Sequence, residues 1–140
     1  MKTLKLKFIF LSLLTLAGFL FSCSSDDEPA ENITINEGNN GDIGGDFIGN
    51  GGSVTETFTW KNSLETADYN ADITSTSTGV FQMIVKDADR TTVLDRTLSG
   101  GTEPDSFSGV TSSGTPGLWT VTISITNFNG DGSFSLSEGD

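Results

Sequence analysis

Residues Gly117–Thr126 read Gly-Leu-Trp-Thr-Val-Thr-Ile-Ser-Ile-Thr and alternate strictly between large apolar and small polar side chains. Successive side chains of an extended chain point to opposite faces. Trp119, Val121, Ile123 and Ile125 would therefore share one face, and the hydroxyl residues between them would share the other. Many of these residues are β-branched or aromatic, which favours an extended backbone. The stretch predicts a β-strand with one face in the protein core.

The same period of two recurs in shorter segments along the chain. In chain order they are Val54–Trp60, Tyr69–Ile73, Val80–Lys86, Thr92–Leu98 and Ser133–Leu136. Gly, Pro, Asn and Asp separate these segments, and none of them has the 3.6-residue period of an amphipathic helix. The pattern predicts an all-β fold, a single small antiparallel β-sandwich of jelly-roll or immunoglobulin-like topology, over residues 54–140.

One of these segments differs from a simple alternation. Val80–Lys86 is apolar on both faces, which is typical of a central strand that is covered on both sides. Asp87–Arg90 follows it and predicts a turn into Thr92–Leu98, so that the two strands form a hairpin. Asp in such a turn commonly accepts hydrogen bonds from backbone N–H groups.

The two closing segments resemble the end of known jelly-roll modules. Gly117–Ile123 and Gly130–Leu136 are similar to the last strands of the prepeptidase C-terminal domain and of the proprotein-convertase P domain. Both families end in a Gly-x-Trp or Gly-x-Tyr strand, a Gly/Asp turn and a short final strand. The resemblance implies a sandwich fold and says little about activity, since those modules are appended to proteases.

The first 22 residues predict a secretory signal peptide. Three lysines precede the apolar run Phe8–Phe21, which is shorter than the about 20 residues that a membrane-spanning helix needs. Leu20–Cys23 then resembles the lipobox of bacterial lipoproteins. The resemblance implies cleavage after Ser22 and acylation of Cys23, the only cysteine of the chain. The alternative is an ordinary signal peptide followed by an unrelated cysteine.

The acidic run Asp26–Glu28 is similar to the surface-export signals of lipoproteins in the Bacteroidota. It implies an outer-membrane protein that is lipid-anchored and exposed at the cell surface; a short solvated linker is the alternative.

Residues 23–53 hold much Gly, Asn, Ser and Asp and few large apolar side chains, and they predict a flexible, disordered linker. One alternative stays open, in which Phe47–Ile48 docks as a short extra strand.

Composition excludes several classes of function. The chain has a formal net charge of −12, and the leader holds three of its seven basic residues. Nucleic-acid binding needs clustered Lys and Arg, so a nucleic-acid partner is not expected. The chain contains no histidine, which excludes Ser-His-Asp catalysis and zinc sites built on histidine. We therefore expect no enzyme activity and no resident cofactor other than a candidate Ca²⁺ ion.

The candidate calcium ligands are Asn127, Asn129, Asp131 and Glu138. Their spacing matches that of an EF-hand loop, in which alternating oxygen ligands and a final glutamate surround the ion. The alternative is a plain turn at Asn127–Gly132, because Asn-Gly and Asp-Gly are strong hairpin signals without any metal.

Two aromatic residues are candidates for partner binding. Phe128 lies in the predicted turn and is not buried by strand alternation, and Tyr69 is the only tyrosine of the chain. We expect a non-catalytic, surface-exposed lipoprotein that binds a protein or glycan partner or serves as an accessory subunit of the cell envelope. A structural subunit of a strand-exchanged surface filament and a calcium-binding β-sandwich module are the alternatives.

Overall fold

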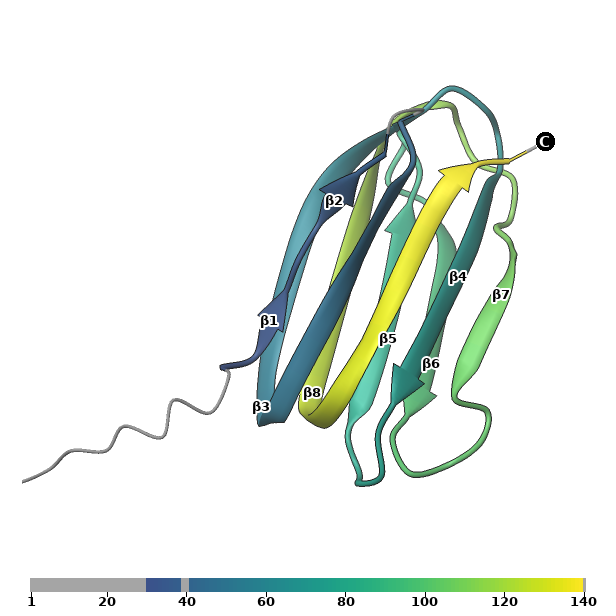
Figure 1. The fold of residues 1–140 in the computed structure, drawn as a ribbon. Coiled ribbons are helices and arrows are strands. Elements are labelled where there is room, and N and C mark those ends of the chain that lie inside the picture. Colours follow the sequence, from purple (N-terminus) through teal and green to yellow (C-terminus); the bar gives the residue numbers. More distant parts are fainter. Residues whose placement is uncertain (1–29, 39–40, 140) are drawn as a thin grey trace, which may run out of the picture.

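The computed structural model describes residues 30–38 and 41–139, and this part of the chain is all β (Figure 1). The strands are β1 (Asn32–Ile33), β2 (Asn36–Glu37), β3 (Ile43–Asn62), β4 (Ala67–Thr74), β5 (Val80–Lys86), β6 (Thr92–Ser99), β7 (Ser106–Val110) and β8 (Gly117–Glu138). All their pairings are antiparallel. Neither described range contains a helix long and apolar enough to cross a membrane.

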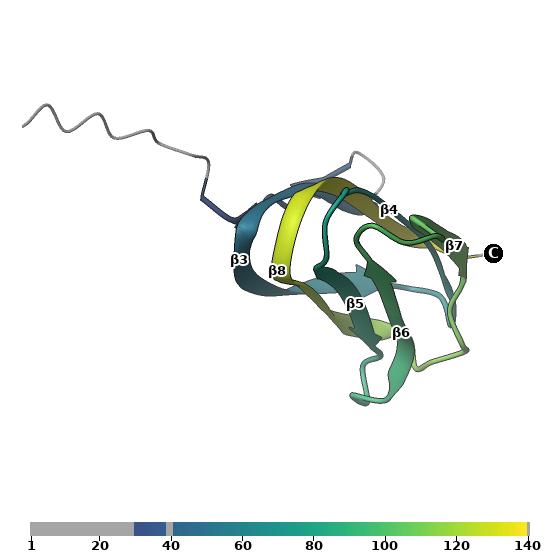
Figure 2. The ribbon, with the colours of Figure 1, turned by 90° about the horizontal axis from the view of Figure 1, so that it is seen from below.

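Two long strands, β3 and β8, connect the two layers of the sandwich. They pair along their whole length, from Ile43 opposite Leu136 to Asn62 opposite Gly117. Register shifts between Asn50 and Val54 interrupt this ladder, and β-bulges of this kind bend and twist a strand. Each strand therefore passes from one layer into the other (Figure 2). The prediction of a single antiparallel β-sandwich is confirmed.

Each layer contains one half of β3 and one half of β8. The first layer also contains β1, β2, β4 and β7, and the second also contains β5 and β6. The core lies between them, where Phe47 of the first layer stacks on Phe81 of the second with ring centroids 4.5 Å apart. The side chains of Trp119, Val121 and Ile123 are fully buried, as their alternation predicts.

The folded part begins earlier than residue 54, the start that we predicted. Residues 43–53, which we predicted to end the flexible linker, form the first half of β3. Ile43 is 4% exposed and Phe47 is 2% exposed. Upstream of them, Ile33 of β1 is buried as well. The alternative in which Phe47 docks as strand is therefore the correct one, and the strand is longer than that alternative assumed.

Glycine explains why composition was misleading here. A Cβ at Gly45 would overlap the carbonyl oxygen of Thr34, and a Cβ at Gly49 would overlap that of Phe128. These glycines let neighbouring backbone come unusually close, which is one of the recognised reasons for glycine within a strand. The glycine-rich composition from which we predicted a flexible linker therefore belongs, in residues 43–53, to a closely packed strand.

The predicted turn at Asn127–Gly132 is also corrected. β8 runs without a break from Gly117 to Glu138, and the bend within it is a bulge in the strand. Asn127 and Gly130 take positive φ angles of 46° and 147° there.

β5 is central in its layer, between β6 and β8, but Ile84 on its outer face is only half-buried. One face of β5 is covered, where the sequence predicted two.

Candidate functional site

The four predicted calcium ligands do not converge. Asn127, Asn129, Asp131 and Glu138 are distributed along β8. An extended strand rises about 3.4 Å per residue, so the first and last lie roughly 37 Å apart along the strand. The carboxylate of Glu138 instead accepts a hydrogen bond from the backbone N–H of Ser63 at 2.5 Å. Across the described residues there is no cluster of three or more His, Cys, Asp or Glu that could hold a metal ion.

The two aromatic residues predicted to bind a partner are in the core. Phe128 is fully buried, with its ring edge-on to that of Phe47 at 5.6 Å. Tyr69 is 8% exposed and packs edge-on against Phe107 at 5.8 Å. Alternation fails at Phe128 because the bulge in β8 shifts its register against β3. Among the described residues, the large apolar side chains that are exposed are all aliphatic.

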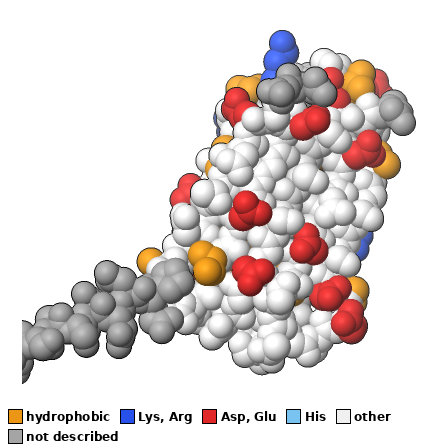
Figure 3. Space-filling view, in the orientation of Figure 1, with side chains coloured by type: hydrophobic (Ala, Val, Ile, Leu, Met, Phe, Trp, Pro, Cys, Tyr) orange, Lys and Arg blue, Asp and Glu red, His pale blue; other side chains and the backbone are white. Residues whose placement is uncertain are grey.

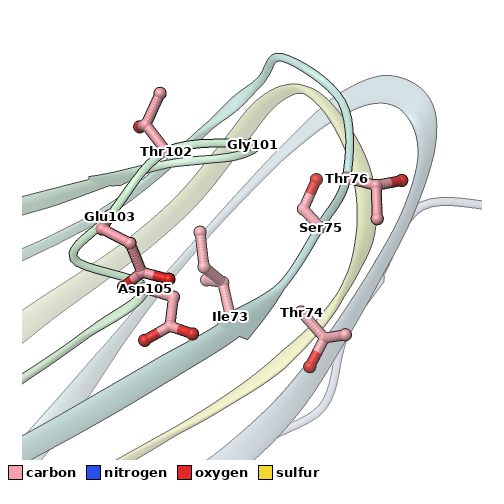
Figure 4. A pocket seen from close by; sticks show the side chains of 8 residues that line it. All are labelled: Ile73, Thr74, Ser75, Thr76, Gly101, Thr102, Glu103 and Asp105. Carbon is pink, nitrogen blue, oxygen red and sulfur yellow. The ribbon is translucent and has the colours of Figure 1, made fainter.

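A cleft lies at the end of the sandwich, where the β4–β5 and β6–β7 connections meet (Figure 4). Its volume is about 470 Å³. It is lined by Ile73, Thr74, Ser75, Thr76, Gly101, Thr102, Glu103 and Asp105. Figure 4 shows the two carboxylates on one wall, the side chains of Thr74 and Thr76 on the other, and Ile73 between them.

Backbone hydrogen bonds fix the two walls of this cleft to each other. The N–H of Ile73 donates to the carbonyl of Asp105 at 2.8 Å, and the N–H of Gly101 donates to the carbonyl of Ser75 at 3.0 Å. The hydroxyl of Ser75 donates to the carbonyl of Asn129 in β8 at 2.6 Å. The walls are therefore held at a set distance, and the binding surface is largely formed before any ligand arrives.

The lining of the cleft suits polar, uncharged or cationic ligands. Glu103 and Asp105 are exposed and supply acceptors, while threonine hydroxyls both donate and accept hydrogen bonds. Ile73, 5% exposed, supplies an apolar surface between them. An anionic ligand would meet two carboxylates and no basic side chain. Sequence reasoning missed this site, because its only signal was the Thr/Ser run Thr74–Thr78, which is typical of any loop.

Acidic side chains also cover the outer face of the first layer. Figure 3 shows Asp and Glu spread over that whole face, with Lys and Arg only at its margins. Most of these carboxylates lie on alternate positions of the strands. One of them, Asp72, accepts a hydrogen bond from the hydroxyl of Ser133 at 2.7 Å. The face therefore repels anionic surfaces as the cleft does.

Asp87 is a buried carboxylate with a structural role. It is 4% exposed, and it accepts backbone N–H hydrogen bonds from Thr115, Asp89 and Thr91 at 2.9, 3.0 and 2.7 Å. The bond from Thr115 is the main cause that holds the pKa of Asp87 below its ordinary value, against the opposing effect of burial. The predicted turn with a capping Asp is confirmed. This turn also fastens the β7–β8 connection.

The predicted signal peptide, Cys23 and Asp26–Glu28 lie outside the described residues. Neither a family model nor a curated protein matches the sequence. Among solved structures, one similar chain is the carbohydrate-binding module TmCBM61 in complex with beta-1,4-galactotriose, with 9% identity, a TM-score of 0.44, and coverage of 79% of this chain and 86% of that one. A CBM4 structure has 12% identity, a TM-score of 0.36, and coverage of 77% and 87%. At these scores neither likeness assigns a ligand.

Proposed function

We propose that this chain is a lipid-anchored, non-catalytic module of the outer membrane whose end cleft binds a neutral, hydroxyl-rich glycan. The observation that carries the proposal is the chemistry of the cleft: two carboxylates, several hydroxyls and one apolar side chain around about 470 Å³. This volume lies within the roughly 300–1,000 Å³ of typical small-ligand sites.

A glycan fits this lining better than the other ligand classes. Sugar hydroxyls donate to carboxylates such as Glu103 and Asp105, and these charge-assisted hydrogen bonds are the stronger kind. The C–H face of a sugar ring could contact only the small exposed part of Ile73, which is 5% exposed, so the carboxylates and hydroxyls would supply most of the contacts. Nucleic acids and anionic lipids would be repelled by the same carboxylates.

The placement of the carboxylates supports binding without turnover. Glycoside hydrolysis uses two carboxylates that flank the bond to be cleaved. Glu103 and Asp105 instead lie on the same wall of an open cleft (Figure 4). A ligand there would meet both as hydrogen-bond acceptors on one side, and the opposite wall contributes only hydroxyl groups.

The anchor would hold this module close to the membrane. Asn32, the first residue of β1, lies nine residue steps after Cys23, and a fully extended chain of that length spans at most about 32 Å. The predicted linker of residues 23–53 would have allowed a much longer reach. The short tether favours a ligand that belongs to the cell envelope or is brought to it.

A glycan array followed by calorimetry tests the binding proposal. We expect a neutral oligosaccharide to bind, and the double variant E103Q/D105N to bind at least tenfold more weakly. The matched control is Asp68→Asn, because Asp68 is exposed on the same layer but is the second residue of β4, at the opposite end from Thr74. Absence of any glycan ligand, or an equal loss in the control, would contradict the proposal.

Metabolic labelling with a radioactive fatty acid tests the anchor. We expect the full chain to incorporate label and to sediment with membranes, and the Cys23→Ser variant to lose both properties. Label that persists in this variant would show that the fatty acid is attached to a residue other than Cys23. Protease treatment of intact cells tests surface exposure, since a periplasmic module would be protected.

A further inference from the structure

The second half of β3, Val54–Asn62, is a free edge of the second layer. It pairs with β8 along this length, whereas β1 and β2 pair only with the first half of β3, between Ile43 and Ile48. Within the described ranges no strand pairs with its other side. Alternate N–H and C=O groups along such an edge point outward and form a template for another strand.

This edge is regular as well as long. Its register with β8 is continuous from Val54 to Asn62, and the segment contains no Pro and no Gly. Val54, Phe58 and Trp60 occur among three threonines, a composition that favours an extended backbone. Bulges, prolines and short length commonly block strand addition at an edge, and this segment has none of them, but it carries two other blocking features, the edge lysine Lys61 and the inward-facing charge of Glu56. These charges disfavour a neutral added strand and leave the edge open to one that brings cationic side chains to Glu56.

A groove runs beside the edge, where β2 of the first layer faces it. The groove has a volume of about 340 Å³ and is lined by Glu37, Gly41, Thr59, Trp60, Lys61, Ser63 and Glu138. Val54 and Phe58 continue the edge with half-buried apolar side chains that pack against the core. The rings of Phe58 and Phe134 are 6.3 Å apart. An added strand would therefore find both backbone partners and apolar surface.

The acidic side chains of the groove favour a cationic occupant. Glu37 and Glu138 line the groove together with one basic residue, Lys61. The backbone N–H of Ser63 is the main cause that lowers the pKa of Glu138, and its hydroxyl and the charge of Lys61 add to the effect. Glu56 lies opposite the buried Ile123 and so is on the core-facing side of the edge, where it is exposed. Cationic side chains would be attracted here.

We propose that an extended, basic segment of a partner protein pairs with Val54–Asn62 as an additional strand. Main-chain hydrogen bonds would supply affinity, and alternate Lys or Arg side chains facing Glu37 and Glu56 would supply specificity. A second copy of this chain is disfavoured, because each copy has a net charge of −12 and would bring the same acidic groove. The surface is separate from the glycan cleft and does not depend on it.

Hydrogen exchange with a model peptide tests the proposal. The probe is an acetylated and amidated nine-residue peptide of alternating Lys and Val, and the protein is the full chain in detergent. We expect the peptide to slow exchange at least tenfold at alternate amides of Val54–Asn62, namely those that do not already bond to β8. Glu37→Gln and Glu56→Gln should each weaken binding about two- to fivefold, as expected for exposed charge pairs, and Asp68→Asn should leave it unchanged.

The same peptide with alternate backbone nitrogens methylated keeps its charge but cannot complete a strand ladder. We expect it to give no protection. Equal binding of the methylated peptide would overturn the proposal, because attraction would then be electrostatic alone. Protection of Val54–Asn62 that rises with protein concentration in the absence of peptide, together with a dimer in sedimentation, would also overturn it and assign the edge to a second copy.

Discussion

The two long sides of the sandwich differ in how the layers meet. On one side, β6 and β7 are joined by side chains: the guanidinium of Arg96 lies 5.2 Å from the ring centroid of Phe107. The backbone N–H of Ser112 also donates to the carbonyl of Val93 at 3.1 Å. On the other side, a groove of about 340 Å³ lies between β2 and the second half of β3, and one side-chain hydrogen bond, from Nε1 of Trp60 to the carbonyl of Gly41 at 2.7 Å, crosses it.

We assign the two sides different roles: contacts on the closed side stabilise the fold, and the open side is the proposed binding edge. On the closed side Arg96 is used internally, where it also donates from Nη1 to the hydroxyl of Tyr69 at 3.5 Å. On the open side the carboxylates outnumber the single lysine of the groove, and among the described residues no strand pairs with the outer side of Val54–Asn62. We therefore expect substitutions on the closed side to affect folding and those on the open side to affect binding.

The largest effect is expected from the aromatic residue of the closed side. Phe107 is 6% exposed and its ring packs near those of Tyr69 and Phe81. Phe107→Ala should lower the free energy of unfolding by about 3–5 kcal/mol. Phe58→Ala, its open-side counterpart, should lower it by about 1–2 kcal/mol, because that side chain is only half-buried. Urea denaturation measures both, and equal losses would remove the distinction between the two sides.

The next effect is pH-dependent and concerns Asp87 beside the closed side. Its folded-state pKa is lowered chiefly by the N–H of Thr115, so its carboxylate stabilises the fold above the pKa of the unfolded chain, about 4. This contribution is lost as pH falls through the lower folded-state pKa. We expect Asp87→Asn to lower Tm at neutral pH and the gap to the parent chain to close at low pH. A gap that stays constant would show that shape, not charge, matters.

A smaller effect is expected from the cation that bridges the closed side. Arg96→Gln removes the contact with the Phe107 ring, and contacts of this kind at exposed positions are worth about 0.5–1 kcal/mol. The control is Lys86→Gln at the exposed end of β5, which should change stability by less than about 0.5 kcal/mol. If both variants lose the same amount, net charge explains the effect and the bridge does not.

The sequence predicted the strands better than it predicted their path. Alternation identified β8 from Trp119 to Ile125 because one face is buried along that length. We divided β8 at Asn127–Gly132, because Asn and Gly tolerate positive φ and occur in hairpin turns and in bulges alike. The structure shows positive φ at Asn127 and Gly130 within a bulge. Whether the partner strand also bends at that point is a tertiary fact, which the local pattern does not contain.

The cleft and the open edge were beyond the sequence for a related reason. Thr74–Thr76 and Glu103–Asp105 meet only because β4 pairs with β7, with Asp72 opposite Ser106. Similarly, Val54–Trp60 has the same pattern as a central strand, and only the strand order places it at an edge. Burial alternation was predictable, but the neighbours of each strand were not.

The smallest effect is expected on the outer face of the open edge. The hydroxyls of Thr57 and Thr122 are 3.1 Å apart and exposed, so water can replace the hydrogen bond between them. Thr57→Val keeps the shape and favours a strand, and we expect it to change the free energy of unfolding by less than about 0.5 kcal/mol. A loss of more than about 1 kcal/mol in urea denaturation would show that cross-strand side chains hold this edge too, and would contradict the division between a closed, stabilising side and an open one.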